Sequence, residues 1–162
     1  MSCLCQKGIG KKMKVLVING PNLNFLGIRE KGIYGSESYE GLVERLKQKA
    51  EQDGIELELF QDNSEGAIID RIQQAYYDKV DGIVINPGAY AHYSIAIRDA
   101  LASIEVPKIE VHISNVYKRE EFRHTSVITP VCTGEILGLG LQGYFLAIDA
   151  LKEYLKNEKG EI

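Results

Sequence analysis

Long apolar runs are missing from this sequence of 162 residues. No run approaches the roughly 18 residues that a membrane-spanning helix needs, so we expect no membrane partner. Basic clusters are missing too, and the formal net charge is −4, which gives no reason to expect nucleic acid. The length suits one domain with a sizeable core and is too short for two ordinary domains.

Cysteine is scarce: the chain has three, at Cys3, Cys5 and Cys132. Free thiols in an odd, scattered set suit a cytoplasmic protein, which is the location we expect. The first two lie in a polar stretch without the apolar region of a secretory signal. We interpret residues 1–12 as a disordered extension, with an upstream start codon before Met13 or a redox or metal Cys-x-Cys motif as alternatives. Residues 13–162 are then expected to form a single domain.

Strand and helix patterns alternate along that domain. The residues predict strands at 15–19, 55–59, 83–85, 107–115 and 126–129, and helices near 38–54, 68–76, 95–101 and 134–155. Alternation of this kind is typical of a parallel sheet covered on both faces, so we expect a flavodoxin-like three-layer α/β fold with a five-stranded parallel sheet. Ligands bind such sheets beyond the carboxyl ends of the strands.

Polar residues follow three of the predicted strands. Asn22 comes after the first strand, Asn86 and His92 after the third, and His112 and Ser114 at the end of the fourth. Any one of them alone is explained by a cap or a turn. Their convergence on one edge of the sheet favours a ligand pocket there.

Glu110 and His112 are expected to share a face of the fourth strand, because side chains alternate along a strand. The carboxylate would orient the imidazole, as a structural or a catalytic partner. No further metal-ligand spacing accompanies this pair. The loop after the first strand carries Pro21, Leu23 and Phe25 instead of a glycine-rich cradle for phosphate, a dinucleotide or a flavin. We therefore expect no metal and no organic cofactor.

The loop after the first strand is unusually long and carries Arg29 and Tyr34. A tyrosine is a poor base at neutral pH, and a neighbouring guanidinium favours the phenolate. An arginine and a tyrosine on a lid, facing histidines on the scaffold, could supply a base and an acid to one pocket. A solvated loop with a packing tyrosine is the alternative. The residues themselves thus indicate a cofactor-free acid–base enzyme for a small polar substrate.

The sequence closely resembles the type II 3-dehydroquinate dehydratases. The resemblance runs from about residue 14 to 155 and rests on the motifs INGPNLNFLGIRE, YG, INPGAYAHYS, IEVHISN, REEFRH and GLGLQGY, in this order. It implies dehydration of 3-dehydroquinate to 3-dehydroshikimate by anti elimination through an enolate. It also implies a place in the shikimate pathway of aromatic amino acid biosynthesis, with quinate catabolism as the alternative. A flavodoxin-like binding protein without catalysis is a less favoured reading, because the reactive residues are all present.

The resemblance also implies catalytic roles. Tyr34 resembles the base that removes the proton α to the ketone, and Arg29 resembles the residue that favours the phenolate and stabilises the transition state. His112 resembles the acid that protonates the departing hydroxyl, with Glu110 behind it. Asn22 would orient the lid and the base.

Contacts with the substrate are implied in the same way. Asn86, His92 and Arg123 resemble residues that bind substrate hydroxyls. The backbone amides of Ile113 and Ser114 would hold the substrate carboxylate.

Two further residues resemble positions at the edge of the pocket. Arg119 resembles a second lid arginine, and Asp99 resembles an acidic residue that reaches the pocket of a neighbouring subunit. Members of this family form trimers that pack into dodecamers, so we expect a homo-oligomer of that kind.

Overall fold

The computed structural model describes residues 11–158, and within them five strands form one parallel sheet in the order β2-β1-β3-β4-β5. The strands are β1 (Lys14–Asn19), β2 (Glu56–Gln61), β3 (Gly82–Asn86), β4 (Lys108–His112) and β5 (Gly134–Leu137). The α-helices are α1 (Lys31–Tyr34), α2 (Tyr39–Asp53), α3 (Glu65–Tyr77), α4 (Ile95–Ala102) and α5 (Gln142–Glu158). This strand order is that of the flavodoxin-like fold and confirms the predicted fold class. None of the described helices is long and apolar enough to cross a membrane.

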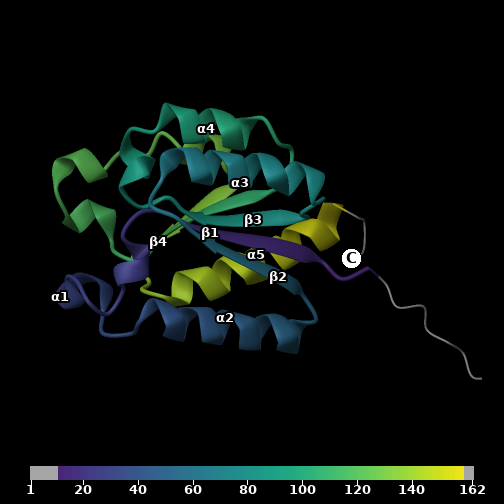
Figure 1. The fold of residues 1–162 in the computed structure, drawn as a ribbon, viewed down its shortest axis with the longest axis horizontal. Helices are drawn as coiled ribbons and strands as arrows, with labels where there is room; N and C mark the ends of the chain where they lie inside the picture. Colours follow the sequence, from purple (N-terminus) through teal and green to yellow (C-terminus); the bar gives the residue numbers. More distant parts are fainter. Residues whose placement is uncertain (1–10, 159–162) are drawn as a thin grey trace, which may run out of the picture.

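The sheet lies between two layers of helices, with α2 and α5 on one face and α3 and α4 on the other (Figure 1). Successive residues of β1 supply both cores, because side chains alternate across a strand. Val15 and Val17 pack in the cluster that includes Leu42 of α2. Leu16 and Ile18 pack in the opposite cluster. A strand that is buried on both faces explains the unbroken apolar sequence of β1.

The helix boundaries follow the local sequence. Ser38, Ser64 and Ser94 each precede a helix and accept a hydrogen bond from a backbone N–H of its first turn. Gly54 ends α2 in the left-handed conformation, with φ of 67°. The predicted start and stop of the helix near residues 38–54 are thereby confirmed.

The fifth strand was predicted in the wrong place. Residues 126–129 form no strand, and β5 is Gly134–Leu137, inside the segment predicted as the start of the last helix. The apolar residues in 126–129 gave the pattern of a short strand, but Ile128 is a buried core residue on a loop. Gly138 and Gly140, with φ of 82° and 61°, make the turn that separates β5 from α5.

The segment after β1 contains more structure than the long loop that the sequence predicted. It holds a 3-10 turn at Leu23–Phe25 and the short helix α1, which carries Tyr34. The lid begins where two strand-end turns touch: a side chain added at Gly20 would place its Cβ 2.6 Å from the carbonyl oxygen of Pro87. Only glycine permits that approach, which fixes the base of the lid against the end of β3.

Candidate active site

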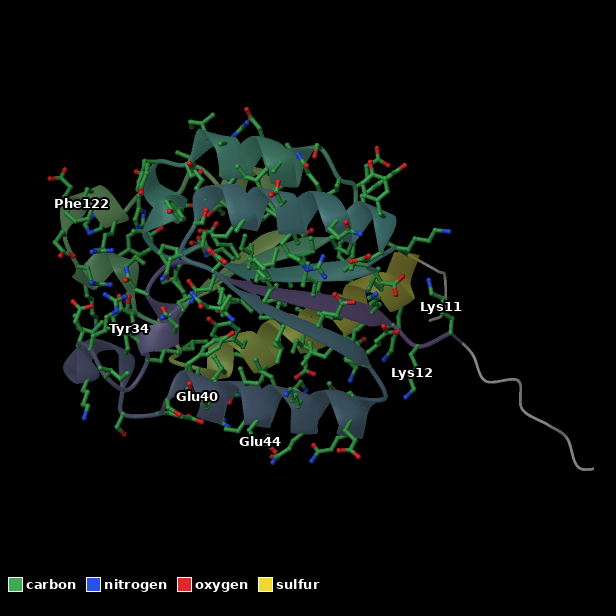
Figure 2. All side chains as sticks on the ribbon, viewed as in Figure 1. Lys11, Lys12, Tyr34, Glu40, Glu44 and Phe122 are labelled. Atoms are coloured by element: carbon green, nitrogen blue, oxygen red, sulfur yellow. The ribbon has the colours of Figure 1, made fainter. Side chains whose placement is uncertain are left out.

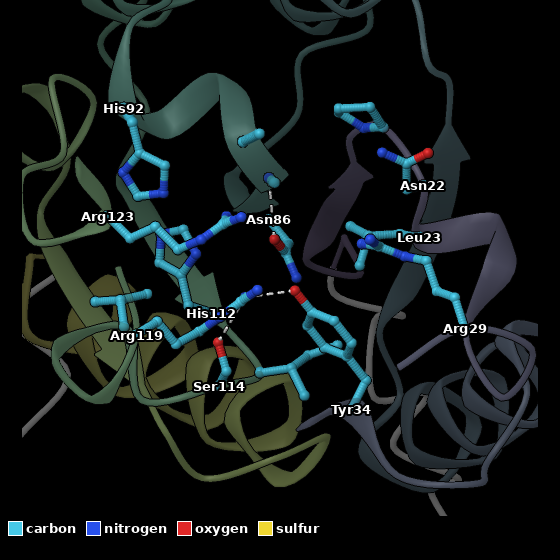
Figure 3. A pocket seen from close by; sticks show the side chains of 15 residues that line it. Asn22, Leu23, Arg29, Tyr34, Asn86, His92, His112, Ser114, Arg119 and Arg123 are labelled. Carbon is cyan, nitrogen blue, oxygen red and sulfur yellow. Dashed lines mark hydrogen bonds between the residues drawn. The ribbon is translucent and has the colours of Figure 1, made fainter. Parts of the chain in front are cut away.

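A pocket lies at the carboxyl edge of the sheet, under the lid (Figure 3). It is lined by residues of the lid, of the turns after β1 and β3, and of the segment from the end of β4 onward: Pro21, Asn22, Leu23, Arg29, Tyr34, Asn86, Gly88, Ala89, His92, His112, Ile113, Ser114, Val116, Arg119 and Arg123. Every site residue predicted from the sequence is in this set except Glu110 and Asp99. Lys11 and Lys12 lie at the opposite end of the molecule from Tyr34 (Figure 2).

The phenol of Tyr34 lies between two guanidinium groups. Arg119 Nη1 donates a hydrogen bond of 2.6 Å to the Tyr34 hydroxyl and one of 3.4 Å to Ser114 Oγ. The guanidinium carbon of Arg29 lies 5.0 Å from the centre of the tyrosine ring. Arg119 therefore contacts the phenol oxygen and also lies near the ring, with its guanidinium carbon 5.4 Å from the ring centre, whereas Arg29 lies over the ring. Spacing along the chain could not reveal this arrangement.

Glu30 joins the two arginines. Its carboxylate lies 2.9 Å from Arg29 Nη1 and 3.9 Å from Arg119 Nη2. Glu30 itself adopts a left-handed conformation, with φ of 43°, at the start of α1. The carboxylate thus ties the lid arginine to the arginine that follows β4.

His112 is held by a fully buried carboxylate. Its Nε2 lies 2.7 Å from Glu110 Oε1, as the alternation along β4 predicted. Glu110 also accepts hydrogen bonds from the hydroxyls of Ser126 and Thr129. A carboxylate that accepts from these two hydroxyl groups acts as an acceptor toward His112 as well, so Nε2 carries a proton. The Nδ1 atom is then the one that can exchange a proton with a substrate.

His92 stacks on His112, with ring centres 6.2 Å apart. Its Nδ1 lies 2.9 Å from the carbonyl oxygen of Thr125, which can only accept a hydrogen bond, so Nδ1 is the donor. Burial lowers the pKa of His92, and the nearby charges of His112 and Arg123 act in the same direction. A neutral His92 therefore offers Nε2 as an acceptor for a hydroxyl group.

Asn86 is fixed by a buried tyrosine that the sequence did not single out. Asn86 Nδ2 donates to the hydroxyl of Tyr144 at 2.8 Å, and that hydroxyl donates to Asn19 Oδ1 at 2.6 Å. Burial raises the pKa of Tyr144, so the hydroxyl keeps its proton at all ordinary pH values. The Asn86 side chain also accepts from the N–H of Gly88, which leaves one amide hydrogen for the pocket.

Tyr144→Phe is expected to destabilise the fold by about 1–3 kcal/mol, because it removes the partner of two buried atoms, Asn86 Nδ2 and Asn19 Oδ1. A rise in KM should accompany the loss, since Asn86 is no longer held in place. Chemical denaturation and steady-state kinetics measure the two effects. Tyr154→Phe, on the exposed side of the same helix, is the control. Unchanged stability would show that the buried hydroxyl chain does not hold Asn86.

Asp99 lies outside the pocket of its own chain. It is an exposed residue of α4 whose carboxylate pairs with Arg98 at 3.0 Å. The role at a neighbouring subunit's pocket stays a prediction.

The fold and the site together define a class: doubly wound α/β proteins with a pocket of tyrosine, histidine and arginine side chains at the carboxyl edge of the sheet. The family model described as dehydroquinase class II matches residues 13–152. The chain belongs to this family.

Individual relatives carry the name of the same family. A 3-dehydroquinate dehydratase of Lachnoclostridium phytofermentans is 73% identical over 139 residues, which are 86% of this chain and 96% of the relative. The crystal structure of the type II dehydroquinase from Butyrivibrio crossotus has 65% identity and a TM-score of 0.87, covering 88% of this chain and 99% of the other. The type II dehydroquinase from Propionibacterium acnes has 48% identity and a TM-score of 0.83, covering 87% and 98%.

Proposed function

We propose that this protein dehydrates 3-dehydroquinate to 3-dehydroshikimate by anti elimination through an enolate. Family membership and relatives named 3-dehydroquinate dehydratase support the activity. The observation that carries the mechanism is the pairing, in one pocket, of a tyrosine hydroxyl held by Arg119 with a histidine held by Glu110.

In this mechanism Tyr34, as phenolate, takes the proton from the carbon next to the ketone. The electron pair of the broken C–H bond moves to the ketone oxygen and forms an enolate. When the carbonyl reforms, the C–O bond of the hydroxyl at the β carbon breaks, and His112 gives its proton to the departing oxygen, which leaves as water. Two guanidinium groups lie beside Tyr34, and their positive charges attract a negative charge on its oxygen. No metal or organic cofactor takes part in this scheme.

The lining of the pocket supports the proposed contacts with the substrate. The backbone amides of Ile113 and Ser114 bind the substrate carboxylate, and Asn86, His92 and Arg123 bind its hydroxyl groups. The neutral imidazole of His92 and the remaining amide hydrogen of Asn86 suit an acceptor and a donor role toward a polyol.

The lid belongs to the same mechanism. Asn22 opens it in a left-handed conformation, with φ of 67°, and its N–H donates to Asn63 at 2.9 Å. Closing the lid excludes water from the enolate and brings Tyr34 to the substrate, and opening it releases the product.

The biological setting is part of the proposal. We assign the activity to the shikimate pathway in the cytoplasm, and quinate catabolism is the alternative. Expression of the chain in a bacterium that lacks its own dehydroquinate dehydratase should restore growth without aromatic amino acids. The organism's own deletion strain distinguishes the roles: loss of growth on quinate alone would favour catabolism.

We further propose a homo-oligomer, a dodecamer built from trimers, in which Asp99 meets the pocket of a neighbour. Its exposed position on α4, away from its own pocket, agrees with that role. Light scattering measures the mass directly. A fully active monomer would contradict both the assembly and the role of Asp99.

The activity has a direct test. Adding 3-dehydroquinate to the purified protein should produce the ultraviolet absorbance of the conjugated enone in 3-dehydroshikimate, at a rate proportional to protein concentration. Absence of the enone with correctly folded protein would remove the proposed function.

A further inference from the structure

Glu135 is a second carboxylate beside His112, and the mechanism above gives it no role. It is on β5, in register with Glu110 of the parallel strand β4, so both side chains lie on one face of the sheet. Its Oε1 lies 4.0 Å from His112 Nε2. The ligating atoms of Glu110, His112 and Glu135 all lie within 4.8 Å of one another.

Two carboxylates in neighbouring register positions repel each other. Such a pair is stable when a positive charge or a proton lies between them, and the imidazole of His112 is the group in that position. A metal ion fits this cluster poorly, because the Glu110 oxygens already accept hydrogen bonds from Ser126 and Thr129. A protonated imidazole needs no free ligand positions: its Nε2–H donates to Glu110, and its charge attracts Glu135 at 4.0 Å.

We propose that Glu135 is a positioning residue for the acid of the reaction: with Glu110, it stabilises the imidazolium of His112 until the proton passes to the departing hydroxyl. The inference rests on the proposed function for the use of that proton. The coupling between Glu135 and His112 is a property of the protein without substrate.

A second cavity beside His112 gives the carboxyl group of Glu135 access to water, which keeps it ionisable. Glu135 lines a second cavity of about 240 Å³, which shares His92, His112 and Arg123 with the active site. That volume holds several water molecules at about 30 Å³ each. The side chain of Glu135 is 21% exposed, whereas that of Glu110 is 0% exposed. Glu135 is thus the hydrated member of the pair, and it can gain or lose charge without unfolding.

Burial and the neighbouring charges shift the pKa of Glu135. Burial raises the pKa of Glu135, and the charge of Glu110 does the same, while the charge of His112 acts in the opposite direction. Cys132 stays neutral because burial raises the pKa of its thiol to about 12. Arg123 and His124 line the same cavity. The raised pKa means that Glu135 takes up its proton at a higher pH than a solvated carboxyl group does, and its charge supports His112 on the alkaline side of that transition.

Glu135→Gln tests this role, since it keeps the shape and removes the charge. A carboxylate near an imidazole favours the charged ring, so its removal lets His112 lose the proton at lower pH. The alkaline limb of kcat should move down by about one pH unit, as expected for one charge near 4 Å in a half-hydrated site, with KM almost unchanged. Glu135→Asp keeps the charge, so the alkaline limb of its kcat profile should lie close to that of the wild type. Glu44→Gln, on the solvent side of α2, should move nothing (Figure 2).

NMR titration of the His112 ring in the substrate-free protein measures the coupling without any activity. The chain has three histidines, so the ring signals can be assigned by substitution. The His112 midpoint should move to lower pH in Glu135→Gln and stay in place in Glu44→Gln. A protein without dehydratase activity but with this shift would remove the proposed function and keep the coupling. An unmoved midpoint and an unmoved alkaline limb would overturn the inference and leave the proposed function intact.

Discussion

Tyr34→Phe is expected to lower turnover of 3-dehydroquinate by at least about 10²–10⁴-fold, the usual cost of losing a positioned acid or base. The substitution removes one oxygen and keeps the ring on which the Arg29 guanidinium lies. Folding and substrate binding should survive, because the proposed carboxylate and hydroxyl contacts come from other segments. Steady-state kinetics and the substrate Kd measure the two effects separately.

Tyr93→Phe is the matched control, since this tyrosine is exposed and lies outside the pocket lining. It should turn over substrate at the wild-type rate. Normal turnover by Tyr34→Phe would mean that the lid tyrosine only packs and that the base lies elsewhere.

His112→Ala is expected to lower turnover by a similar factor of about 10²–10⁴, through loss of the acid that assists the departing hydroxyl. Glu110 loses one donor but keeps Ser126 and Thr129, so the buried carboxylate stays solvated by hydroxyl groups and the fold should persist. Kinetics with a denaturation curve for each variant separate the two effects. Wild-type turnover in His112→Ala would contradict its role as the acid.

The sequence predicted the parts of the fold whose pattern is local. The unbroken apolar run of β1, the serine caps and Gly54 act over a few residues, so strand and helix positions could be derived from them. The fifth strand was misplaced because Ile128 is buried by tertiary packing, and the short strand around Glu135 has too few residues to show alternation.

The candidate site also has a part that the sequence predicts and a part that only the structure shows. The polar residues after β1, β3 and β4 meet because parallel strands end at one edge, so Asn22, Asn86 and His112 could be placed together from the sequence. Contacts between residues far apart in the sequence could not be predicted. Arg119 and Tyr34 are 85 residues apart, and Tyr144 and Asn19 are 125 residues apart. Only the folded chain shows that Arg119 contacts the phenol oxygen and that β5 brings Glu135 to His112.

Exchange of the substrate's α-proton in deuterated water tests the central claim, that Tyr34 removes this proton. The two variants are compared by NMR of recovered 3-dehydroquinate, with a sample lacking protein to measure spontaneous exchange. His112→Ala keeps the base and is expected to incorporate deuterium next to the ketone, although its dehydration is slow. Tyr34→Phe is expected to incorporate none above the spontaneous rate. Equal enzymatic exchange in both variants would contradict the assignment of Tyr34 as the base.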